Sequence, residues 1–128
     1  MNRIFISLAC FLIFLTSCEQ KKTEKSINNP EQIKQRFSKM LEDYYEGTLA
    51  LDPLAATSYG EEQFNGEFPN YLSKVYKDSS IAFYAKFKVM AEGFENKFLS
   101  ANDTMSKEVL LWECDMNLNA LKFRTELF

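Results

Sequence analysis

The sequence predicts an all-α protein of about four helices. Apolar side chains recur every three or four residues over three long stretches between residues 30 and 127, and this spacing places them on one face of a helix. Asn29-Pro30 and Asp52-Pro53 each join a capping side chain to a proline. Such pairs are typical of a helix start, because the first turn does not use the N–H that proline lacks.

The first helix is expected over residues 30–50, capped by Asn29. Its apolar stripe comprises Ile33, Phe37, Met40, Leu41, Tyr44 and Leu49. A proline disfavours the helical region for the residue before it, so the helix should break at Asp52-Pro53. Asp52 then caps a short second helix, residues 53–58, which Gly60 can close.

Residues 60–70 hold Asn65-Gly66 and Pro69 without a sustained period, which indicates a turn-rich connection. The third helix is expected over residues 72–98, with Val75, Phe83, Phe87, Met90, Ala91, Phe94 and Phe98 facing the core. The fourth is expected over residues 105–127, capped by Thr104 or Ser106. Its core face would carry Val109, Leu110, Cys114, Leu118 and Leu121.

Residues 1–17 have the pattern of a secretory signal peptide: Arg3 gives a positive start, and the twelve residues 4–15 are mostly apolar. These twelve fall short of the about 20 that a membrane-spanning helix needs. The run Leu15-Thr16-Ser17-Cys18 resembles the lipobox of bacterial lipoproteins, in which the cysteine sulfur receives a diacylglycerol and the chain is cleaved before it. We therefore expect cleavage after residue 17 and a lipid on Cys18. A plain secretory signal and an uncleaved anchor are the less favoured alternatives.

Residues 18–29 are expected to form a lipidated flexible tether, because Ile27 is the only apolar side chain after the cysteine and cannot offset the entropy of ordering. Two or more acyl chains on Cys18 would hold the protein on the extracytoplasmic side of a membrane in the bacterial cell envelope. The net charge is −3 for the whole chain, and loss of Arg3 with the signal makes it −4. This balance gives no reason to expect nucleic acid as a partner.

The sequence assigns no catalytic, cofactor-binding or metal-binding residue. It contains no histidine, so Cys114 lacks the usual base of a cysteine nucleophile and is interpreted as a core thiol. Two acidic pairs at helical spacing, Glu42 with Glu46 and Glu92 with Glu95, could in principle bind a metal. A solvated helix face is the favoured interpretation of both pairs.

A group of aromatic residues could line a groove for a peptide or sugar, although packing between the helices and the connection is favoured. The group comprises Tyr44, Tyr45, Tyr59, Phe64, Phe68 and Tyr71. Trp112 lies off the apolar stripe of the fourth helix. It is expected to face a second layer or a further part of the protein.

The run from Leu51 to Gly60, Leu-Asp-Pro-Leu-Ala-Ala-Thr-Ser-Tyr-Gly, with Phe64-Asn65 and Phe68-Pro69-Asn70 after it, resembles the opening segment of the family called domain of unknown function 885. The later helix pair, joined through Leu99-Ser100 and Asp103, is similar too, and the resemblance covers about residues 32–128. That family includes many bacterial lipoproteins. Its full-length members are several times longer, are largely helical, and carry a His-Glu-x-x-Pro-Gly-His-like motif in a C-terminal half that resembles zinc metallopeptidases.

The resemblance implies that residues 30–128 are the N-terminal, non-catalytic helical segment of a larger helical domain. Zinc is implied only for a C-terminal part beyond this chain, since paired histidines are needed to hold it there and this chain has none. The alternative is a complete small lipoprotein that acts as a binding or adaptor module. A small independent enzyme is the least favoured of the three functions.

Both favoured functions imply a partner surface for the apolar helix faces. The chain stops on Thr125-Glu126-Leu127-Phe128 without a capping glycine or a polar tail, and residues 18–128 carry 16 aromatic side chains. We therefore expect either a C-terminal domain or a protein partner to cover these faces.

Overall fold

Three long helices and one short one make up the part of the chain that the computed structural model describes, residues 29–123, and this part contains no strand. The elements are α2 (Pro30–Leu51), α3 (Pro53–Ser58), the 3₁₀ turn η2 (Glu62–Phe64), α4 (Lys74–Glu92), the 3₁₀ turn η3 (Asn96–Phe98) and α5 (Ala101–Ala120). The prediction of an all-α fold with about four helices is confirmed. The predicted signal peptide, nearly all of the tether and residues 124–128 lie outside the described residues.

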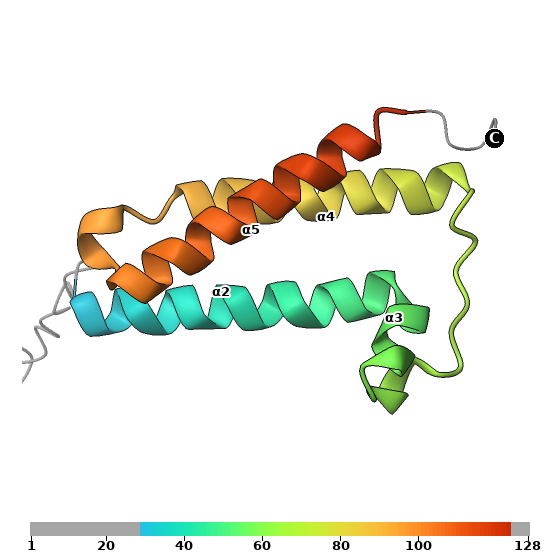
Figure 1. The fold of residues 1–128 in the computed structure, drawn as a ribbon, viewed down its shortest axis with the longest axis horizontal. Helices are drawn as coiled ribbons and strands as arrows, with labels where there is room; N and C mark the ends of the chain where they lie inside the picture. The colour runs from blue at the N-terminus through green and yellow to red at the C-terminus, as the bar shows by residue number, and fades with distance from the viewer. Residues whose placement is uncertain (1–28, 124–128) are drawn as a thin grey trace, which may run out of the picture.

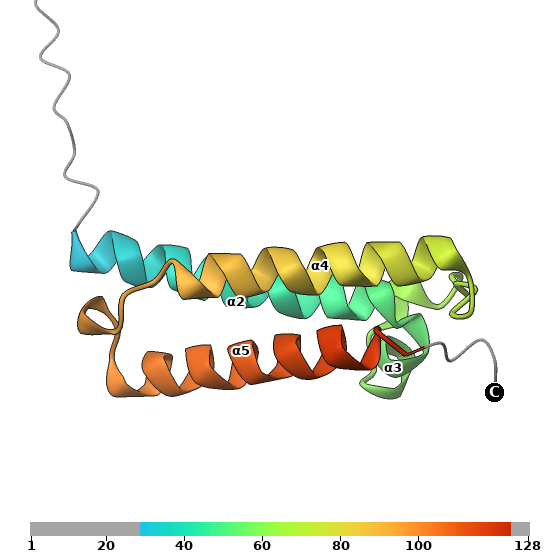
Figure 2. The same cartoon turned by 90° about the horizontal axis from the view of Figure 1, so that it is seen from above.

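Helix α4 is central to the arrangement, because α2 and α5 both pack against it. The chain reverses direction between successive long helices, so α4 runs antiparallel to the other two (Figure 1). Seen from above, α2 and α4 overlap while α5 runs alongside them (Figure 2). The short helix α3 and the connection after it lie at the end of the molecule away from η3.

The two predicted Asn-Pro and Asp-Pro helix starts are confirmed. The Asn29 side chain accepts a hydrogen bond from the N–H of Glu31 at 3.1 Å, and Asp52 Oδ1 accepts one from the N–H of Ala55 at 3.1 Å. Each bond satisfies a backbone donor that has no partner inside its helix. Gly60 adopts a φ of 87°, the left-handed conformation that lets the chain leave α3.

The third helix is shorter than the predicted residues 72–98. It starts at Lys74, where the Ser73 hydroxyl accepts a hydrogen bond from the N–H of Tyr76 at 3.1 Å, and it ends at Glu92 with Gly93 as its cap residue. Leaving the helix turns Phe94 onto α2, where its ring meets Phe37 edge-to-face at 5.2 Å. Tertiary packing therefore overrides the helical spacing after Glu92.

The fourth helix begins four residues earlier than predicted. Ser100 caps it, accepting a hydrogen bond from the N–H of Asp103 at 3.1 Å, while its hydroxyl donates to the Asp103 carboxylate at 2.7 Å. Thr104 and Ser106, the predicted caps, lie inside α5. The helix ends at Ala120, and the turn that follows contradicts the predicted continuation over residues 121–123.

The core forms where all three long helices meet. Its buried members are Phe37, Met40, Tyr44, Phe87, Ala91, Leu110 and Cys114. Most of the expected core faces are confirmed, but Met90 is 38% exposed, and Val75 and Val109 are 76% and 56% exposed. Those two valines obey the helical period without facing the core.

Candidate functional site

Cys18, the predicted lipidation site, lies outside the described residues. The candidate residues within residues 29–123 fall at scattered positions. No group of three or more Cys, Asp or Glu side chains among the described residues is arranged to hold a metal ion, and the sequence has no histidine.

Cys114 is a core thiol, fully buried on α5 among the residues of the core. Burial raises its pKa to about 11, and the nearby Glu113 carboxylate adds to the shift. Because the thiolate is the reactive form, a raised pKa makes this cysteine a poor nucleophile at neutral pH. Its placement agrees with the prediction.

Glu42 and Glu46 lie on an exposed face of α2, as predicted. The prediction for the second pair is wrong, because α4 ends at Glu92, and Glu95 lies beyond it, where it pairs with Lys97 at 2.6 Å. The Glu42 carboxylate forms an ion pair with Lys39 Nζ at 2.9 Å, and the Glu92 carboxylate lies 4.0 Å from Lys88 Nζ. Glu46 and Glu95 are exposed. Surface pairs of this kind contribute little to stability, typically about 0–1 kcal/mol.

Asp52 caps α3 and also binds Tyr71, whose hydroxyl donates to Asp52 Oδ1 at 3.1 Å. Burial, followed by this hydrogen bond, raises the pKa of Tyr71. The bond joins the connection before α4 to the start of α3, and no local sequence pattern predicts it, because the two residues lie 19 positions apart. Asp52 therefore acts as a structural cap.

The predicted aromatic group does not converge on one groove. Tyr44 belongs to the core, whereas Tyr59 and Phe68 are 71% and 76% exposed. Tyr71 packs edge-to-face against Phe68 at 6.0 Å and against Tyr76 at 5.0 Å. These rings serve the core and the connection separately.

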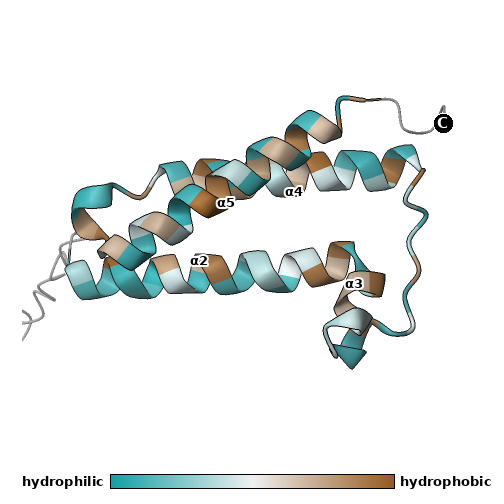
Figure 3. Cartoon of the chain, viewed as in Figure 1, coloured by the Kyte–Doolittle hydropathy of each residue, from teal (hydrophilic) through white to brown (hydrophobic). Residues whose placement is uncertain are grey.

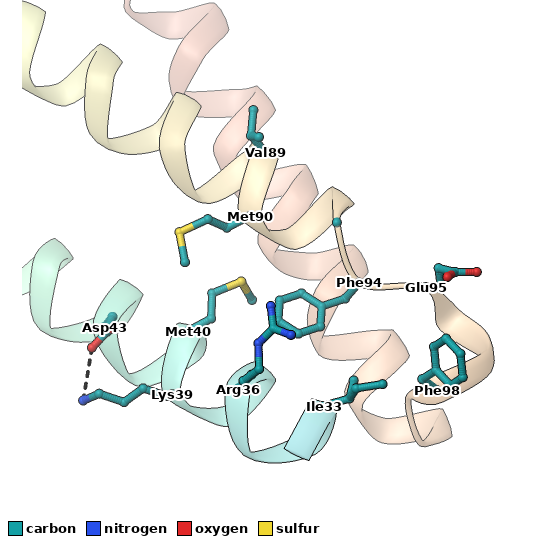
Figure 4. A pocket seen from close by; sticks show the side chains of 11 residues that line it. Ile33, Arg36, Lys39, Met40, Asp43, Val89, Met90, Phe94, Glu95 and Phe98 are labelled. Atoms are coloured by element: carbon teal, nitrogen blue, oxygen red, sulfur yellow. Dashed lines mark ion pairs between the residues drawn. The ribbon is translucent and has the colours of Figure 1, made fainter. Parts of the chain in front are cut away.

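A shallow cavity of about 470 Å³ lies between α2 and the end of α4 (Figure 4). Met40 and Met90 point toward one another across it, and the Arg36 guanidinium lies 5.9 Å from the centre of the Phe94 ring. Lys39 at its edge is held by Asp43 at 3.1 Å, and the Glu42 and Asp43 carboxylates raise the pKa of Lys39.

Helix α5 carries an exposed apolar stripe, named here the outer stripe. Its members lie four, three and four residues apart and are 65%, 56%, 65% and 47% exposed: Met105, Val109, Trp112 and Met116. At 100° per residue they lie on the side of the helix opposite Leu110 and Cys114, which face the core. Hydrophobic segments accordingly recur along α5 (Figure 3).

A groove of about 390 Å³ adjoins this stripe between α2 and α5. Leu41 and Tyr44 of α2 line one side, and Met105, Val109 and Glu113 of α5 line the other. The groove and the outer stripe share Met105 and Val109, so they form one continuous apolar surface. The spacing of this stripe is visible in the sequence, but the same spacing predicts that Val109 faces the core, which is wrong.

Comparison of the chain with protein-family models, curated proteins and solved structures finds no match. Among the described residues, none of the helices combines the length and apolar character needed to cross a membrane. The outer stripe and its groove are therefore the candidate functional site, on the grounds of their geometry.

Proposed function

We propose that this chain is the non-catalytic N-terminal helical part of a larger, lipid-anchored, zinc-metallopeptidase-like protein of the bacterial cell envelope. Cys18 carries the lipid, and residues 18–29 separate the membrane from α2. The helices after the tether provide packing surface for the rest of the protein. Zinc and catalysis belong to the C-terminal part.

The outer stripe carries this proposal. A helix that packs against a single core is apolar on one face only, whereas α5 is apolar on two opposite faces. Monomeric proteins rarely leave contiguous apolar patches of this kind in water, and such patches usually mark contact with another surface. In this proposal α5 is an inner helix of a larger helical domain.

The anchor is supported by residues 1–18 and by arithmetic of lipid burial. Each buried methylene of an acyl chain contributes about 0.8 kcal/mol, and two chains are needed for stable attachment. The diacylglycerol that a lipobox cysteine receives supplies two. A tether with a single apolar side chain then leaves the helical part clear of the lipid surface.

The proposal is tested by changing Cys18 to Ser in the protein expressed in a bacterium with its own N-terminal segment. A palmitate analogue should label the wild type, which should sediment with membranes, whereas Cys18→Ser should lose the label and be released. The matched control is Cys10→Ser, which should leave both results unchanged. Equal labelling and sedimentation of Cys18→Ser would refute the anchor.

The family assignment is tested separately by the reading frame after codon 128. A frame that continues into a His-Glu-x-x-Pro-Gly-His-like segment supports the larger protein. A stop codon directly after Phe128 refutes it and favours the alternative, a complete small lipoprotein that uses the outer stripe as an adaptor.

A further inference from the structure

We propose that the outer stripe and the adjoining groove form the seat of one amphipathic helix that carries Lys or Arg beside its apolar face. This inference rests on the proposed function, because we assign that helix to the remainder of the same larger protein. It adds the chemistry of the occupant, which the proposed function does not specify.

The spacing of the outer stripe identifies a helix as the occupant. Successive members at intervals of four, three and four residues repeat the seam of a coiled coil, in which such positions on one helix pack into gaps on another. The groove between α2 and α5 widens this seam on one side. A helix laid along α5 would cover Met105, Val109, Trp112 and Met116 together.

The charges beside the stripe identify the flanks of that helix as basic. Glu108 and Glu113 lie on either side of it, at the positions where coiled coils place the charged residues that choose a partner. Neither carboxylate has an ion-pair partner within residues 29–123, whereas Asp115 is held by Lys88 at 2.5 Å. Both carboxylates therefore lack a cationic partner among the described residues, and Glu113 lies in the groove near Tyr44, whose pKa is raised by burial first and by this carboxylate second.

The basic side chains of α5 itself do not supply this charge. Lys107 donates to the backbone carbonyl of Phe94 and, at 2.8 Å, to Asn96 Oδ1, which holds it toward η3. Lys122, beyond the end of the helix, donates to Asn119 Oδ1 at 2.7 Å. Glu108 and Glu113 are therefore the unpaired charges beside the stripe within the described residues, while Asp115 on the same helix is neutralised by Lys88.

The same two carboxylates disfavour two other occupants. A second copy of this chain docked stripe to stripe would bring Glu108 and Glu113 against their equivalents, and like charges at such positions repel. An anionic membrane surface would meet the same two carboxylates. Charge complementarity thus favours a basic amphipathic helix.

Trp112 provides a direct readout, since it is the only tryptophan in the sequence and belongs to the stripe. The whole chain, expressed with its own N-terminal segment and carried in phosphatidylcholine vesicles, is titrated with two synthetic 21-residue peptides without tryptophan. Both repeat a heptad with Leu at the seam; one has Lys beside the seam and the other has Glu. We expect the Lys peptide to shift Trp112 emission to the blue with a Kd at least about tenfold lower than that of the Glu peptide.

Two pairs of variants make the titration specific. Val109→Ser with Met116→Ser should weaken binding of the Lys peptide at least about tenfold. Val75→Ser with Val89→Ser, which alters two exposed residues of α4, should leave it unchanged. Glu108→Lys with Glu113→Lys should reverse the preference in favour of the Glu peptide. Glu61→Lys with Glu62→Lys, in the connection after α3, should leave the preference for the Lys peptide unchanged.

Several results would overturn the inference: no shift of Trp112, equal binding of the two peptides, or an equal loss in the α4 control. Circular dichroism checks each fold, and if the serine variants lose helix, the charge-reversal pair decides, because it leaves the stripe intact. Emission already shifted in vesicle-bound protein, relative to Cys18→Ser protein in buffer, would mean that lipid covers the stripe and would also overturn it.

Repeating the titration on the longer protein, where the reading frame continues, tests the source of the helix. We expect no peptide binding there, because the protein's own helix already occupies the stripe. Binding of the Lys peptide to that protein would overturn the assignment to the same polypeptide. A failed release by Cys18→Ser would refute the anchor alone and would leave the peptide result standing.

Discussion

At the residue scale, Gly47 shows how one absent side chain shapes the packing of α2 on α4. A Cβ atom placed there would collide with Cε2 of the Phe83 ring. The Phe83 ring is held by its neighbours, with ring centres 5.5 Å from Tyr44 and 4.8 Å from Phe87. The glycine therefore admits an aromatic ring that any larger residue would displace.

Gly47→Ala should lower the free energy of unfolding by about 1–2 kcal/mol, because displacing the Phe83 ring outweighs the roughly 1 kcal/mol that alanine gains in a helix. Urea denaturation measures the change. The same substitution at Gly66, which has no atom within 4 Å of an added Cβ, should have little effect. Adding Phe83→Leu should reverse the sign of the Gly47 effect, and a stabilising Gly47→Ala in the original background would contradict this packing.

The Tyr44 hydroxyl is buried and has no hydrogen-bond partner among the described residues. Tyr44→Phe keeps the ring contacts with Phe83 and Phe87 and removes the unpaired group, so stability should stay the same or rise by up to about 1 kcal/mol. Tyr71→Phe is the control: it deletes the hydrogen bond to Asp52 and should cost about 1 kcal/mol. A loss above about 1.5 kcal/mol for Tyr44→Phe would reveal a partner for that hydroxyl.

Burial of Cys114 predicts a loss of stability in alkaline solution. The folded chain raises the pKa of this thiol from 9.0 to about 11, so above pH 9 the unfolded chain releases a proton that the folded chain retains. The free energy of unfolding therefore falls as pH rises through this window. Tyr44 and Tyr84, whose pKa values burial also raises, act in the same direction at higher pH.

Urea denaturation at pH 7, 9 and 10.5, on the wild type and on Cys114→Ala, measures this dependence. The variant should lose less stability than the wild type between pH 9 and 10.5, whatever its stability at pH 7. Parallel pH profiles for the two proteins would show that the thiol does not contribute.

At the element scale, the helix starts separate what local chemistry predicts from what it does not. Asn29 and Asp52 were predictable because each cap and its proline act within one turn. Ser100 was not predicted as a cap because the apolar spacing of residues 72–98 continues almost to that residue. The packing of Phe94 against Phe37 shows that the chain has already left the helix there. Long-range packing decided the boundary.

Ser100→Ala should destabilise the protein by about 1 kcal/mol, because the N–H of Asp103 loses its acceptor. Thermal unfolding followed by circular dichroism measures the effect. Ser106→Ala is the matched control, since that serine lies inside α5 and alanine is the better helix former there. If Ser106→Ala proved the more harmful substitution, Ser100 would not be the operative cap.

The two faces of α5 explain the principal error in the expected core. Helical spacing shows that residues share a face, but it does not show which of two apolar faces meets the core. Leu110 and Cys114 face α4, whereas Val109, one residue before Leu110, belongs to the outer stripe. The candidate site was thus present in the sequence as a pattern and needed the structure to be distinguished from core.

At the scale of the whole molecule, the proposed lipid on Cys18 and the exposed apolar face of α5 lead to the same account. The core joins α2, α4 and α5, yet Trp112 and its neighbours remain exposed on the far side of α5. In our proposal the tether brings this unit to the membrane, and a basic helix from the rest of the protein completes it.

The mass of the lipid-labelled protein in its native membrane tests the central claim most directly. An antibody raised against residues 30–123 would isolate the protein for intact mass spectrometry. We expect a diacylglycerol-modified Cys18 at the first position of a polypeptide several times longer than residues 18–128. An unlipidated protein, or a lipidated one whose polypeptide ends at Phe128, would contradict the account.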